Sequence, residues 1–133
     1  MGELPTLIAM LRATLAGRED VELALLFGSF ARGSWRADSD VDVAVQGADL
    51  DLLALAADLA AAAGREADVV DLGRAGYPLT QALLRDAIVL HEGRPGAAAS
   101  WRTRAILETE TDRPWFERMR DAYLKRLADV RHG

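Results

Sequence analysis

The sequence predicts an α/β (α+β) domain with a helical C-terminal section. Short apolar segments typical of strands alternate with segments whose apolar residues recur every three or four positions, as in helices. After residue 96 only helical patterns remain. With 133 residues and no linker or internal repeat, the chain is predicted to be a single domain (1–133), with a core at about 5–92 and a helical tail at about 100–131.

The first two predicted elements are a helix and a buried strand. Residues 5–16 are predicted to be helical, because Pro5 suits a first turn and apolar residues follow at helical spacing (Leu7, Met10, Leu11 and Leu15). Residues 21–27 form an apolar run that only Glu22 interrupts, which is typical of a buried strand.

A sharp turn and a second strand follow. Gly28-Ser29 predicts the turn, and residues 30–34 predict a short helix that ends at Gly33. Residues 40–45 predict the second strand, in which acidic and apolar side chains alternate.

The remaining elements complete the alternation. Asp49 is the expected N-cap of a Leu/Ala-rich helix over 50–63, which Gly64 ends. The other predicted elements, from the same signals, are a strand at 67–72, a helix at 79–86 after Pro78, a strand at 87–91, a helix at 101–109 and a new helix that starts near Pro114.

Composition excludes several classes of protein. There are no cysteines, so disulfides and thiolate metal sites are excluded. No apolar run is long enough for a membrane span and no basic signal-peptide region is present, so we expect a cytoplasmic protein. A net charge of −5 argues against direct nucleic-acid binding. Residues 101–133 nevertheless carry a net charge of +2, which indicates either a solvated helix face or a docking surface for a partner.

The candidate site lies around the turn and the second strand. Asp40 and Asp42 are two residues apart on a strand, so they project to one face, where a divalent cation such as Mg²⁺ would offset their repulsion. Gly28 lets the backbone approach a phosphate group, and Ser29 offers a hydroxyl and helix N–H groups to phosphate oxygens.

A third carboxylate would complete the site. Asp68 and Asp71 are three residues apart and so lie on opposite faces of a regular strand. If Val69 faces the core, Asp68 shares the face of Asp40 and Asp42, so Asp68 is favoured and Asp71 is the alternative.

These residues carry a family resemblance. Gly28-Ser29, ten residues and then Asp40-x-Asp42 resemble the signature of the DNA polymerase β-like nucleotidyltransferase superfamily. The fuller GSFARG and SDVDV segments resemble its minimal nucleotidyltransferase (MNT) branch, which includes the antitoxins of HEPN/MNT toxin–antitoxin pairs. The resemblance implies the polymerase β-like fold, a small mixed sheet flanked by helices.

The same resemblance implies an activity. It is the Mg²⁺-dependent transfer of AMP from ATP to a tyrosine of a partner HEPN ribonuclease toxin, with pyrophosphate as the leaving group. By this resemblance Gly28 and Ser29 hold the triphosphate, Asp40 and Asp42 bind metal in a two-metal site, and Asp68 is a metal ligand or general base. Arg32 either contacts phosphate or pairs with Asp38 at the surface.

Two other functions remain compatible with the sequence. The chain could transfer a nucleotide to a small molecule or to RNA, although about thirty residues after position 100 are few for a substrate domain. Alternatively, it could neutralise a toxin by binding and occlusion without catalysis, using the amphipathic, Arg-rich tail.

Overall fold

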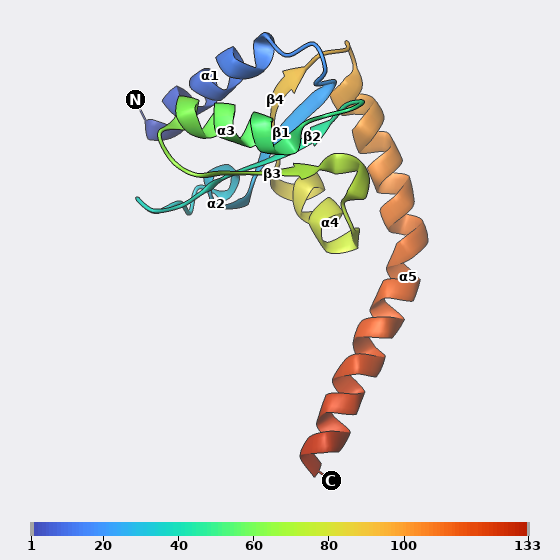
Figure 1. Cartoon of the computed structure of the whole chain (residues 1–133). Helices are drawn as coiled ribbons and strands as arrows, with labels where there is room; N and C mark the ends of the chain where they lie inside the picture. The colour runs from blue at the N-terminus through green and yellow to red at the C-terminus, as the bar shows by residue number, and fades with distance from the viewer. Residues whose placement is uncertain (1, 133) are drawn as a thin grey trace.

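A four-stranded mixed sheet forms the centre of the molecule (Figure 1). The computed structural model describes residues 2–132, with side chains to residue 130. The strand order is β3-β2-β1-β4. The strands are β1 (Leu23–Phe27), β2 (Val41–Gln46), β3 (Ala67–Asp71) and β4 (Ile88–Glu92). β1 pairs antiparallel with β2 and β4, whereas β2 and β3 are parallel. The predicted fold class is therefore confirmed.

Two helices cover one face of the sheet. They are α1 (Glu3–Ala16) and α3 (Leu52–Ala63), and α3 is the crossover that the parallel pair β2–β3 requires (Figure 1). Alternate residues of β2 point into this layer and are fully buried there with leucines of both helices (Val41, Val43, Val45, Leu11, Leu15, Leu55 and Leu59). The other residues of β2, including Asp42, therefore face the opposite side.

The opposite face carries α4 (Tyr77–Asp86) and the first part of α5 (Ala97–His132). Their smaller core buries Leu25, Ala44 and Leu83, and Trp101 of α5 packs against it. Two short helices connect the strands, α2 (Gly28–Arg32) directly after β1 and the 3₁₀ turn η1 (Leu72–Arg74) directly after β3. Only part of this face is covered, and the end of the sheet next to α2 carries Asp42.

The tail differs from the prediction of two helices. α5 is one helix from Ala97 to His132, and Pro114 lies inside it. Thr109 is buried before the proline, and Phe116 stacks on Tyr77 of α4 after it, with ring centroids 4.6 Å apart. Because α4 holds both sides of Pro114, the helix continues through the residue that lacks an N–H.

The N-cap of α3 is also corrected. The cap is Asp51 rather than Asp49, because the Asp51 side chain accepts a hydrogen bond from the Ala54 N–H at 3.0 Å. Asp49 lies two residues before this cap and instead adopts a left-handed backbone conformation, with φ of 53°. Gly33 and Gly64 end α2 and α3 in the left-handed conformation, as predicted. Within residues 2–132, no helix has the length and apolar character to cross a membrane.

Candidate active site

Two of the predicted carboxylates are neighbours on adjacent strands. Asp42 of β2 and Asp68 of β3 are register partners in the parallel pair, so both side chains project from the same face. Asp40 immediately precedes β2 and is exposed, as is Asp68, whereas Asp42 is half-buried. The sheet thus brings Asp40, Asp42 and Asp68 together at the end where β2 and β3 begin.

Gly28 lies directly against this group. Phe27, the last residue of β1, pairs with Asp42, so the turn that follows passes over the carboxylate. Gly28 has φ of +75°, and a Cβ built on it would overlap Oδ2 of Asp42. Both the backbone conformation and the close approach therefore require glycine at this position.

Ser29 and Arg32 lie on the short helix that this turn begins. Ser29 is the second residue of α2 and is half-buried, so its hydroxyl stands at the helix N-terminus beside Gly28. Arg32 is exposed at the other end of α2, and its positive charge favours the ionised form of Asp42. Among the ion pairs of the described residues, none joins Arg32 to Asp38, so the surface pairing considered from the sequence is not present.

The electrostatics of Asp42 indicate a site for a cation. Its pKa is raised, chiefly because burial disfavours the charged carboxylate, and further by the negative charges of Asp68 and Asp40. Arg32 lowers this pKa and offsets part of the effect. A divalent cation would reverse the balance, because it would stabilise all three ionised carboxylates.

Asp71 has a different environment. Its side chain accepts a hydrogen bond from the Gly73 N–H at 2.9 Å and caps η1, and Arg74 lies 3.9 Å from its carboxylate. It is three residues beyond Asp68, so it is on the other side of β3. Asp71 therefore stabilises the end of the strand, and the structure does not bring it to Asp42.

The carboxylates suit Mg²⁺ in their chemistry. Over residues 2–132, no three acidic or histidine side chains converge as placed on one metal position. Mg²⁺ does not require such a cage, because it binds through one or two carboxylates and completes its shell with water and substrate phosphates. Asp40 and Asp42, with Asp68 alongside, supply these oxygens next to a turn open to phosphate, so the residues fit the ion.

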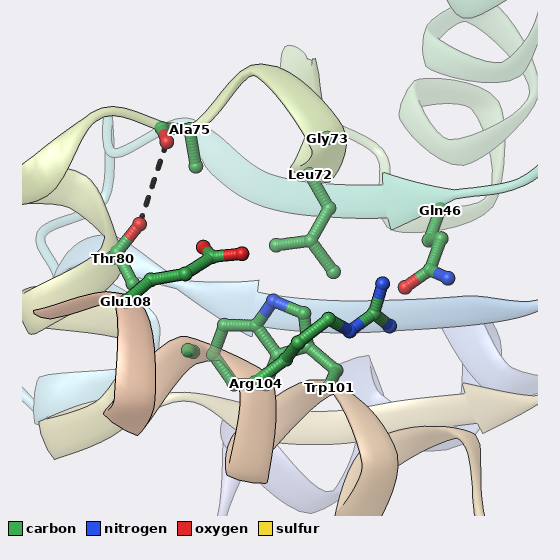
Figure 2. Close-up of a pocket in the computed structure, with 9 residues that line it drawn as sticks. Gln46, Leu72, Gly73, Ala75, Thr80, Trp101, Arg104 and Glu108 are labelled. Carbon is green, nitrogen blue, oxygen red and sulfur yellow. Dashed lines mark hydrogen bonds between the residues drawn. The ribbon is translucent and has the colours of Figure 1, made fainter.

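A partly open cavity lies farther along the same face (Figure 2). It has a volume of about 220 Å³ and lies between Gln46 at the far end of β2 and Trp101, Arg104 and Glu108 of α5. Gln46 is four residues beyond Asp42, roughly 13 Å along a strand. None of the predicted site residues lines this cavity. Sequence analysis missed it, because its walls come from distant segments that no local pattern connects.

Comparison with known proteins agrees with this geometry. Residues 10–95 match the family model described as polymerase beta, nucleotidyltransferase. Because this match covers most of the chain, the protein belongs to the polymerase β nucleotidyltransferase family. Among curated protein sequences none gives a significant match.

Solved structures point to one branch of the family. A chain of a toxin–antitoxin crystal structure with AMP-PNP is 25% identical over 88% of this chain and 98% of its own, with a TM-score of 0.76. A chain of the complex between a tri-AMPylated Shewanella oneidensis HEPN toxin and its MNT antitoxin is 25% identical, over 92% of this chain and 96% of its own, with a TM-score of 0.65. The toxin–antitoxin MntA-HepT gives the same identity and TM-score, over 92% and 97%. The resemblance to MNT antitoxins is therefore confirmed.

Proposed function

We propose that this chain is an antitoxin that transfers AMP from ATP to a tyrosine of a partner HEPN ribonuclease toxin and thereby neutralises it. The observation that carries the proposal is the close approach of Gly28 to Asp42, whose register partner is Asp68. A glycine turn against paired carboxylates suits a triphosphate and its metal ion. The similar structures with AMP-PNP and with an AMPylated HEPN toxin support this choice of nucleotide and acceptor.

Each residue has a role in the proposed reaction. The Gly28 turn, Ser29 and Arg32 bind the triphosphate, and Asp40, Asp42 and Asp68 would hold Mg²⁺. When bound, the metal supplies charge stabilisation to the phosphate oxygens. The tyrosine oxygen forms a bond to the α-phosphorus, the bond from that phosphorus to the β-phosphate oxygen breaks, and pyrophosphate leaves. Asp68, the exposed member of the strand pair, takes the phenol proton.

Transfer of labelled AMP tests the proposal directly. The protein is incubated with α-labelled ATP, Mg²⁺ and a candidate HEPN partner protein. We expect label on a tyrosine of the HEPN protein, loss of its ribonuclease activity, and neither effect with the Asp40→Ala/Asp42→Ala variant. Tight binding without label, together with neutralisation by this variant, would instead establish the non-catalytic antitoxin. Label on RNA or on a small molecule but not on the HEPN protein would establish the other alternative.

A matched pair on β3 tests the third carboxylate. We expect Asp68→Asn to reduce AMP transfer by about a hundredfold or more, because it removes a charged site ligand or base. Asp71→Asn is the control, since an asparagine oxygen can still accept the hydrogen bond from Gly73. Equal loss in both variants, or loss only in Asp71→Asn, would reject the assignment of Asp68.

A further inference from the structure

The second half of α5 carries an apolar face that nothing in the described part of the chain covers. Figure 1 shows this half running past α4 and away from the sheet. Its large apolar side chains are exposed, for example 59% for Tyr123 and 77% for Val130. At about 100° per residue, one line along the helix contains the residues that we call the α5 stripe, Met119, Tyr123, Leu127 and Val130.

The α5 stripe continues a face that is used inside the molecule. Ala105 and Thr109 lie on the same line about three to four turns before Met119 and are buried, and Phe116 stacks on Tyr77 of α4. This side of α5 therefore packs against the domain in the first half of the helix and extends beyond the domain in the second half. An apolar helix face that continues beyond the residues it packs against in its own domain is typical of a surface that binds another protein.

Basic side chains border the stripe on both sides. Arg113, Arg120 and Arg126 border the stripe, within about 80° of its line. The opposite side of the helix carries both signs of charge, since the acidic residues of the segment lie there together with two basic ones (Glu117, Asp121, Asp129, Arg118 and Lys125). The surface that a partner would meet is thus apolar in the middle and positive at its edges.

This pattern selects the kind of partner. A helical stripe over residues 119–130, about 18 Å long, packs best against another helix. Arginines at both edges favour acidic residues around an apolar strip on that helix. Two copies of this chain paired through their stripes would instead bring arginine against arginine, which disfavours a homodimer at this surface.

The position of the stripe relates it to the candidate active site. The second half of α5 lies on the side of the sheet that carries α4, and Asp42 and Asp68 project from that same face. α4 also contacts α2, so it lies between the glycine turn and the part of α5 that precedes the stripe. A protein bound along the stripe is therefore on the correct side of the sheet to present an acceptor to the carboxylates.

We propose that the α5 stripe docks an α-helical surface of the toxin with an apolar centre and acidic edges, and so delivers the acceptor tyrosine to the site. The inference rests on the proposed function. It adds the binding surface on this chain and the chemistry of the partner surface that matches it.

Adjacent residues on opposite sides of α5 provide a matched test. Leu127 belongs to the stripe, whereas Ala128 is exposed on the other side, so Leu127→Glu and Ala128→Glu add the same charge one residue apart. Titration calorimetry with this chain and the candidate HEPN partner protein should show Kd at least about tenfold weaker for Leu127→Glu. Ala128→Glu should remain within about twofold of wild type. Equal affinities of the two variants would overturn the proposal.

Further measurements separate docking from chemistry. In AMP transfer, Leu127→Glu should raise KM for the HEPN protein and leave kcat at saturation near that of wild type. Arg120→Glu/Arg126→Glu should weaken binding and reduce its dependence on salt. If wild type neither binds nor labels the HEPN protein, the proposed function itself fails. If wild type labels it and Leu127→Glu does so with unchanged KM, only the docking proposal fails.

The oligomeric state of the chain tests whether a second copy of the chain, rather than the toxin, binds the stripe. Sedimentation of the chain alone should show a monomer for wild type and for Leu127→Glu. A wild-type dimer that Leu127→Glu dissociates would assign the stripe to a second copy and overturn the proposal.

Discussion

The two ends of this molecule bury their apolar residues to very different degrees. In the sheet and its covering helices, Leu11, Val43 and Leu59 are completely buried, each by side chains from other elements. In the second half of α5, Tyr123, Leu127 and Val130 are equally apolar and remain exposed. Since burial of such side chains is the main stabilising contribution to folding, the first region specifies the fold. The second is free to serve the proposed recognition of a partner, and the candidate catalytic residues lie at the edge of the first.

The largest expected effect is on catalysis. Replacing both carboxylates in Asp40→Ala/Asp42→Ala should lower AMP transfer by about a thousandfold, because metal binding and the associated charge stabilisation are lost. Binding of the HEPN protein should persist, since the α5 stripe is unchanged. Single-turnover kinetics and calorimetry measure the two effects. Loss of both together would contradict the separation of chemistry from recognition.

The contrast in burial predicts a contrast in stability. Leu11→Ala should lower the free energy of unfolding by about 2–5 kcal/mol, because it leaves a cavity among fully buried side chains. Leu127→Ala should change it by less than about 0.5 kcal/mol, because Leu127 is 45% exposed beyond the domain. Urea denaturation of the two variants measures both. A large loss for Leu127→Ala would show that the stripe is buried within the chain's own fold.

Gly28 and Gly33 have similar backbone conformations, so their alanine variants distinguish the effect of backbone strain from the effect of the close approach to Asp42. Gly28→Ala should cost about 1–2 kcal/mol of stability for its positive φ and also lower AMP transfer by about a hundredfold, because the new Cβ displaces the Asp42 carboxylate. Gly33→Ala has nearly the same φ, +78°, but no atom within 4 Å of the new Cβ. Gly33→Ala should therefore lower stability without lowering AMP transfer. A reduced kcat in both variants would contradict a role for the close approach of Gly28 to Asp42.

The smallest expected effect concerns the ionisation of Asp42. Its folded-state pKa is raised, so the folded protein binds this proton more tightly than the unfolded chain does. In metal-free buffer, this contribution to stability is therefore present at low pH and lost as pH rises past the folded pKa. Asp42→Asn lacks the ionisation and should melt slightly higher than wild type at neutral pH, with a difference that shrinks on acidification. Thermal melting between pH 4 and 7 measures it, and a constant difference would reject the assignment.

Much of the geometry of the candidate site was predictable, because it depends on local spacing. Strand alternation places Asp40 and Asp42 on one side, and the glycine turn precedes them at a fixed distance. The preference for Asp68 over Asp71 followed from the alternation of side chains along β3, which places residues three apart on opposite faces. The parallel register with β2 then explains the result physically, because it sets Asp68 beside Asp42 while Asp71 caps η1.

The sequence by itself determined the alternation of strands and helices and the positions of the candidate phosphate- and metal-binding residues, since both are encoded in short-range patterns. Tertiary structure alone decided three other features. α4 packs on both sides of Pro114, so α5 continues where a local rule predicts a new helix. The cavity at Trp101 forms between segments far apart in the chain. Finally, α5 extends beyond the end of α4, and its buried face becomes an exposed stripe there. This point depends on packing neighbours, which no local sequence pattern specifies.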